Sequence, residues 1–88
     1  MLVRYFAAAR AATGIDEETL LHGGPITVAE LLEQLTSLHP IAATEHATPL
    51  GQLLTRCSFL RNETAVRSLD AELDPDDTVD ILPPFAGG

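Results

Sequence analysis

Lysine is absent from this 88-residue sequence, and five arginines supply all of its basic side chains. The missing lysine excludes a P-loop phosphate site, a Schiff-base nucleophile and a serine–lysine dyad, each of which needs a lysine amine. With 13 acidic residues the formal net charge is −8, which disfavours nucleic acid and anionic membrane surfaces as partners. No apolar run approaches the roughly 18 residues of a membrane span. We therefore expect no nucleic-acid partner and no membrane.

Cysteine is nearly as scarce, since Cys57 is the single thiol. One thiol excludes an internal disulfide and any metal site built from several cysteines. The three histidines lack metal-ligand spacing, so we expect no bound metal. A lone thiol suits a reducing compartment, and residues 2–6 favour a β-strand over a secretory leader, so we expect a cytoplasmic protein. Cys57 itself is expected to be a small core residue rather than a nucleophile.

The hydrophobic pattern predicts one small α+β domain, because 45% hydrophobic residues can build a single core in a chain of this length. Residues 27–38 predict the main helix, with a Thr27–Glu30 capping box at its start and Pro40 after its end. Shorter helices are predicted over 7–12 and 50–54. Strands are predicted at 2–6, 19–22, 58–60, 65–67 and 78–82. One amphipathic helix on a mixed sheet is an α+β roll, and we expect its first and last strands to be parallel neighbours.

The end of the sequence differs from an ordinary surface segment. Two prolines, Pro83 and Pro84, fix the backbone as it leaves the last strand, and Gly87 and Gly88 follow Phe85 and Ala86. Glycine allows a backbone to enter a space that has no room for a Cβ atom. We therefore divide the chain into a domain over 1–83 and a flexible tail over 84–88, with the Gly88 carboxylate as its distinctive reactive group.

Together these features resemble the ubiquitin-like β-grasp sulfur carriers of the MoaD/ThiS type, and among them the small subunits of molybdopterin synthases. The resemblance covers nearly the whole chain and is least clear over 41–54. The residues that carry it are Val3-Arg4-Tyr5-Phe6-Ala7, Arg10, Gly14, Thr27-Val28, Asn62 and the ending Asp76-Asp77-Thr78-Val79-Asp80-Ile81-Leu82-Pro83-Pro84-Phe85-Ala86-Gly87-Gly88. Arg61 departs from the pattern, because the family usually has an apolar residue there. We therefore expect the packing of the sheet around Arg61 to differ from that of the family.

The resemblance implies a sulfur carrier that is not an enzyme alone. An adenylyltransferase of the ubiquitin-activating type would use ATP and magnesium to adenylate Gly88, next to Gly87, and a sulfurtransferase or desulfurase would supply sulfur for a thiocarboxylate. That sulfur would pass to a cyclic pyranopterin to form the molybdopterin dithiolene. The catalytic residues are expected in the large synthase subunit, within a heterotetramer. No permanently bound cofactor is expected.

The resemblance also implies where partners dock. If the helix covers one face of the sheet, Phe6 and Leu82 lie on the other, open face near the tail, where an apolar patch would mark an interface. In the family, partners dock on this face, and the matching positions here are Phe6, Ala65 and Leu82. The contact is expected to continue along Pro83, Pro84, Phe85 and Ala86. In the competing placement, Phe6 folds back under the alanine-rich segment 7–12.

Two alternatives remain open. A carrier of the same fold could serve thiamin thiazole or cysteine biosynthesis, with the same chemistry at Gly88 and a different acceptor; the Pro83-Pro84 ending favours the molybdopterin branch. A ubiquitin-like modifier of other proteins, or a plain interaction module, belongs to a different class. A plain module would not need a free terminal glycine.

Overall fold

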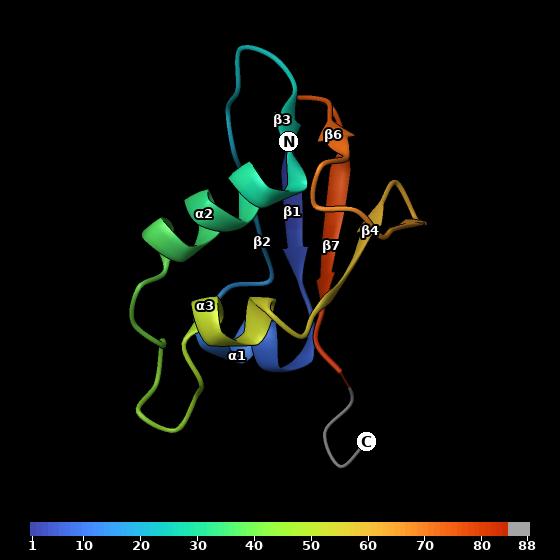
Figure 1. Ribbon diagram of the computed structural model, residues 1–88. Helices are drawn as coiled ribbons and strands as arrows, with labels where there is room; N and C mark the ends of the chain where they lie inside the picture. Colours follow the sequence, from blue (N-terminus) through green and yellow to red (C-terminus); the bar gives the residue numbers. More distant parts are fainter. Residues whose placement is uncertain (85–88) are drawn as a thin grey trace.

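A five-stranded mixed sheet forms one layer of the protein, and helices pack against one side of it (Figure 1). The computed structural model describes residues 1–84. The strand order is β2-β1-β7-β4-β5, in which β1 and β7 are parallel and the other neighbours are antiparallel. These strands are β1 (Leu2–Tyr5), β2 (Glu17–Thr19), β4 (Ser58–Arg61), β5 (Thr64–Val66) and β7 (Thr78–Leu82). The predicted parallel pairing of the first and last strands is confirmed.

Three helices were expected and three are present among the described residues. They are α1 (Ala7–Thr13), α2 (Val28–Leu38) and α3 (Leu50–Leu54). The capping box of α2 is complete, because the Thr27 hydroxyl accepts from the Glu30 amide while the Glu30 carboxylate accepts from the Thr27 amide. Gly14 ends α1 in the left-handed region, with φ of 78°.

The core lies between the sheet and the helices. Val3, Tyr5, Val79 and Ile81 point from the two central strands toward the helices and are fully or almost fully buried. The helices contribute Ala9 and Ala12, Val28, Leu31 and Leu35, and Leu50, Leu53 and Leu54. Because side chains alternate along a strand, Arg4, Asp80 and Leu82 must point to the opposite face of the sheet. This face carries no helix in the described part of the chain (Figure 1).

Two strand predictions were displaced. The strand expected at 19–22 is β2 at Glu17–Thr19, and β5 begins one residue earlier than expected. β2 was not predicted at its observed position because its sequence is acidic, and an edge strand needs few buried side chains. The Glu18 carboxylate is instead satisfied by hydrogen bonds from Tyr5 and from His39, which lies at the C-terminal cap of α2.

A second, two-stranded sheet was not predicted. It pairs β3 (Ile26–Thr27) with β6 (Glu72–Leu73) at the start of α2. Strands of two residues carry too little alternation for a sequence pattern to show them.

Arg61 does not disturb the sheet, although an apolar residue was expected there. Its guanidinium donates to Asp77 at 2.6 Å and to Asp74 at 3.0 Å. The aliphatic part of the Arg61 side chain can therefore extend away from the strand, while its guanidinium is paired with the two carboxylates near the start of β7. The departure from the family pattern is compensated locally.

None of the helices in residues 1–84 is long and apolar enough to cross a membrane. Residues 85–88, which include four of the predicted site residues, lie outside the described part of the chain.

Candidate functional site

The open face of the sheet carries one row of residues in register across four strands. Arg4 of β1 lies beside Asp80 of β7, Asp80 beside Leu60 of β4, and Leu60 beside Ala65 of β5. Ala65 is exposed, and Leu60 is half-buried. The row therefore consists of a charged pair on β1 and β7 and two apolar residues on β4 and β5.

Phe6 and Leu82 form the next step of this face toward the end of β7. The Phe6 amide donates to the Ile81 carbonyl at 3.3 Å, which continues the β1–β7 pairing by one residue. Phe6 is 39% exposed and Leu82 is half-buried. The placement of Phe6 on the surface is thus confirmed, and the alternative in which it folds under α1 is wrong. Its part in docking remains a prediction.

The chain leaves the sheet at the same end. Pro83 is half-buried and Pro84 is exposed, so the two prolines lead away from the edge of the face that Phe6 and Leu82 occupy. The other predicted site residues, Phe85, Ala86, Gly87 and Gly88, follow there and are outside the described residues. The structure therefore brings together Phe6, Leu82 and the two prolines, with Ala65 two strands away.

A charged pair lies within this face, and the sequence analysis missed it. The Arg4 Nε and Nη2 atoms donate to the two carboxylate oxygens of Asp80, at 2.6 and 2.9 Å. The Asp80 side chain is 7% exposed and that of Arg4 is 36% exposed. The hydrogen bond and the charge of Asp80 raise the pKa of Arg4, so the guanidinium is charged throughout the physiological range. The signal was available: both residues sit at open-face positions of two strands expected to be parallel neighbours.

Leu60 is the other member of the face that was missed. Its strand was predicted, but its position beside Asp80 depends on the β4–β7 register, which a sequence pattern does not give.

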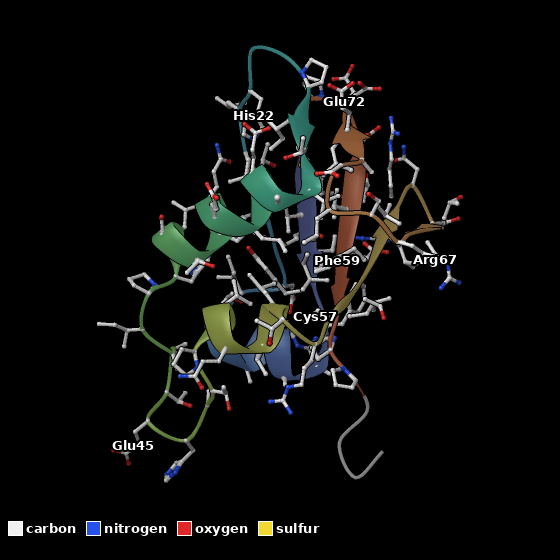
Figure 2. The ribbon with its side chains drawn as sticks, in the orientation of Figure 1. His22, Glu45, Cys57, Phe59, Arg67 and Glu72 are labelled. Atoms are coloured by element: carbon white, nitrogen blue, oxygen red, sulfur yellow. The ribbon has the colours of Figure 1, made fainter. Side chains whose placement is uncertain are left out.

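Cys57 lies between α3 and β4 (Figure 2). Its thiol is 3.2 Å from the Leu53 carbonyl, to which it donates. Burial raises its pKa to about 11, and the charge of Arg56 opposes this rise. A thiol that stays protonated at neutral pH is a poor nucleophile. The interpretation of Cys57 as a packing residue fits this environment.

His39, Glu18 and Tyr5 form a second polar cluster, on the helix side of the sheet. Glu18 accepts from both Tyr5 and His39, and burial together with this bond raises the pKa of the Tyr5 phenol. The cluster joins β1 and β2 to the end of α2 and has a structural role. Within residues 1–84, no three His, Cys, Asp or Glu side chains come close enough together to hold a metal ion.

A family profile described as the ThiS family matches residues 3–88 of this chain. The chain belongs to the ThiS family. A similar protein matches over nearly its full length: the chain is 34% identical over 87 residues to the molybdopterin synthase sulfur carrier subunit of Chlamydomonas reinhardtii. That alignment covers 98% of this chain and 95% of the relative.

Solved structures of similar proteins support the β-grasp architecture expected for a ThiS-family chain. SAMP1 from Haloferax volcanii superposes with a TM-score of 0.75 at 25% identity, covering 99% of this chain and 97% of that one. The complex of subunits 1 and 2 of molybdopterin-converting factor from Helicobacter pylori contains a chain that matches with a TM-score of 0.63 at 22% identity. That match covers 99% of this chain and 96% of the other. The fold is therefore a ubiquitin-like β-grasp.

Proposed function

We propose that this protein is a sulfur carrier of the molybdopterin synthase small-subunit type. The similarity to the Chlamydomonas sulfur carrier subunit carries the proposal, because it spans both chains almost end to end. The geometry supports it. Exposed and half-buried apolar side chains, Phe6 and Leu82, lie at the end of the sheet from which Pro83 and Pro84 lead toward Gly88.

The proposed chemistry takes place at the Gly88 carboxylate. A carboxylate oxygen attacks the α-phosphorus of ATP, held with magnesium by an adenylyltransferase of the ubiquitin-activating type, and pyrophosphate leaves. A persulfide sulfur from a sulfurtransferase or desulfurase then displaces AMP, and cleavage of the sulfur–sulfur bond by a thiol leaves a thiocarboxylate. Adenylation is needed because a free carboxylate is a poor acyl electrophile. The carrier itself holds no permanent cofactor in this scheme.

The acceptor would be a cyclic pyranopterin bound in the large synthase subunit, where two sulfur transfers build the molybdopterin dithiolene. The large subunit, in a heterotetramer with the carrier, would supply the acids and bases, and this chain has no lysine to contribute. The Helicobacter complex of subunits 1 and 2 supports such a pairing. We propose that the open face docks on this partner while residues 84–88 enter it, and that both proteins work in the cytoplasm.

Membership of the ThiS family does not distinguish a carrier for molybdopterin synthesis from a carrier for thiamin thiazole or cysteine biosynthesis. Those carriers would share the activation of Gly88 and differ in the acceptor. The two proposals therefore predict the same result for the activation of Gly88 and different results only when the acceptor is tested.

Intact-mass spectrometry after incubation with ATP, magnesium, a sulfur donor and the adenylyltransferase of the same organism tests the first step. We expect one sulfur to replace one oxygen. Two control chains, one without Gly88 and one with an alanine appended after it, should keep their mass. An unchanged mass for the native chain, with an activating enzyme shown to act on another carrier, would refute the proposal. Adding the large subunit and the pyranopterin then tests the acceptor.

A further inference from the structure

We propose that the Arg4–Asp80 pair is the specificity element of the open face, and that it requires a partner surface with a neutral hydrogen-bond acceptor, such as a main-chain carbonyl or an amide oxygen, opposite Arg4. This inference rests on the proposed docking of the open face on the large synthase subunit. It adds a polar requirement to an interface that Phe6, Leu60, Ala65 and Leu82 would otherwise make purely apolar.

The pair occupies the middle of the face rather than its rim. Strands lie on both sides of it, since β2 flanks Arg4 and β4 flanks Asp80. The Phe6 ring centroid is 5.9 Å from the Arg4 guanidinium carbon, within reach of a cation–π contact. A partner that covers Phe6 and Leu60 must therefore also cover Arg4.

Burial of Arg4 under the partner opposes binding unless the remaining hydrogen-bond donors of its guanidinium are satisfied. Asp80 takes the Nε and Nη2 donors, and the described residues offer no hydrogen-bond acceptor to Nη1. The 36% of the side chain that water reaches in the free protein would lose that water on docking. A charged donor buried without an acceptor opposes binding, so the partner has to provide one.

The charge around Arg4 indicates which kind of acceptor fits. Arg4 borders a cleft of about 350 Å³, together with Asn62, Glu63 and Thr78. Asp80 already neutralises the guanidinium, and the charges of Glu17 and Glu63 also act on it. A partner carboxylate would add a further negative charge to this acidic surrounding, whereas a neutral oxygen satisfies Nη1 without repulsion.

The test replaces both charges together. Arg4→Met alone would leave Asp80 buried without its partner, which endangers the fold, so the variant is Arg4→Met/Asp80→Leu. An apolar pair of similar volume keeps the sheet packed and makes the face more hydrophobic. The matched control is Glu45→Leu/His46→Met, which removes an exposed pair on the loop between α2 and α3, remote from the sheet (Figure 2).

Binding to the large synthase subunit of the same organism is measured by calorimetry, after melting curves show that each variant is folded. We expect the Arg4/Asp80 variant to bind about tenfold to a hundredfold more weakly than the native chain, and the control to bind like it. Equal or tighter binding of the Arg4/Asp80 variant would overturn the inference, since added apolar surface alone would then govern docking. A loss that shrinks as salt is added would overturn the neutral acceptor in favour of a carboxylate. Absence of binding by the native chain would refute the docking proposed above.

Discussion

Asp77 holds the turn between β4 and β5 against the start of β7, and its removal has a calculable cost. The side chain is buried, at 8% exposure. Its Oδ1 accepts from the Asn62 amide at 2.9 Å, and its Oδ2 accepts from Arg61 at 2.6 Å and from the Asp74 backbone at 2.7 Å. Three donors thus converge on one carboxylate, which an Asp77→Asn substitution would replace by a single oxygen.

The asparagine can keep its oxygen toward Arg61 and Asp74 only by turning its amide nitrogen toward the Asn62 amide. That orientation loses one neutral hydrogen bond, about 1 kcal/mol, and the charge assistance of the Arg61 bond, which is worth about as much again. We expect Asp77→Asn to lower the free energy of unfolding by about 2 kcal/mol near neutral pH. Asp76→Asn is the matched control, because it removes the same charge from the exposed neighbour and should change stability by less than about 0.5 kcal/mol.

The same carboxylate predicts a pH dependence. Burial by itself would raise the pKa of Asp77, but hydrogen bonds from Asn62, the Asp74 backbone and Arg61 outweigh it and hold the pKa below its usual 3.8. A group with a lowered folded pKa stabilises the native state above its unfolded pKa, and this contribution is lost as the pH falls through the folded value.

Urea unfolding near neutral pH and at stepwise lower pH measures both effects. The native chain should lose more stability below pH 3.8 than Asp77→Asn does, so the two free energies of unfolding converge. A gap that stays constant with pH would refute this assignment of the ionised carboxylate. So would an Asp77→Asn chain as stable as Asp76→Asn at neutral pH.

Three further outcomes follow from particular backbone and surface positions. Glu63 has φ of 72° in the two-residue β4–β5 turn, so Glu63→Gly should raise the free energy of unfolding by about 0.5–1 kcal/mol in urea titrations; a loss would contradict the strain. Gly14 has φ of 78°, and a Cβ there would lie 2.9 Å from that of Ala43. Gly14→Ala should therefore cost about 1–2 kcal/mol, and an unchanged melting midpoint would refute this. Leu82→Asp should weaken large-subunit binding at least about tenfold while the monomer stays folded, with Leu21→Asp as the exposed control; an unfolded variant would place Leu82 in the core.

The elements with strong local signals were predictable. The capping box and the Val28–Leu35 periodicity fixed α2, and the alternation of Val79 and Ile81 fixed the inner face of β7. Local pattern and final structure agree there because the same side chains that define the period also fill the core.

The elements that depend on distant partners were not predictable. β2 is acidic, and its one inward carboxylate, Glu18, is satisfied by Tyr5 and His39, which lie 13 and 21 residues away. The charged pair on the open face also joins distant residues, but it could have been predicted, because alternation places Arg4 and Asp80 on the same face of two strands expected to be neighbours. Phe6 and Leu82 could be placed on that face, because alternation alone decides it, whereas Leu60 needed the β4–β7 register.

The parallel pairing of β1 with β7 also constrains when this protein can fold. It joins Arg4 to a residue 76 positions later, so β1 lacks its central neighbour until residues 78–82 have been synthesised. Closing so long a loop is slow compared with forming local contacts. The strand that completes the sheet is also the one that leads to the C-terminal residues. A chain that lacks residues 78–82 therefore cannot present an assembled open face.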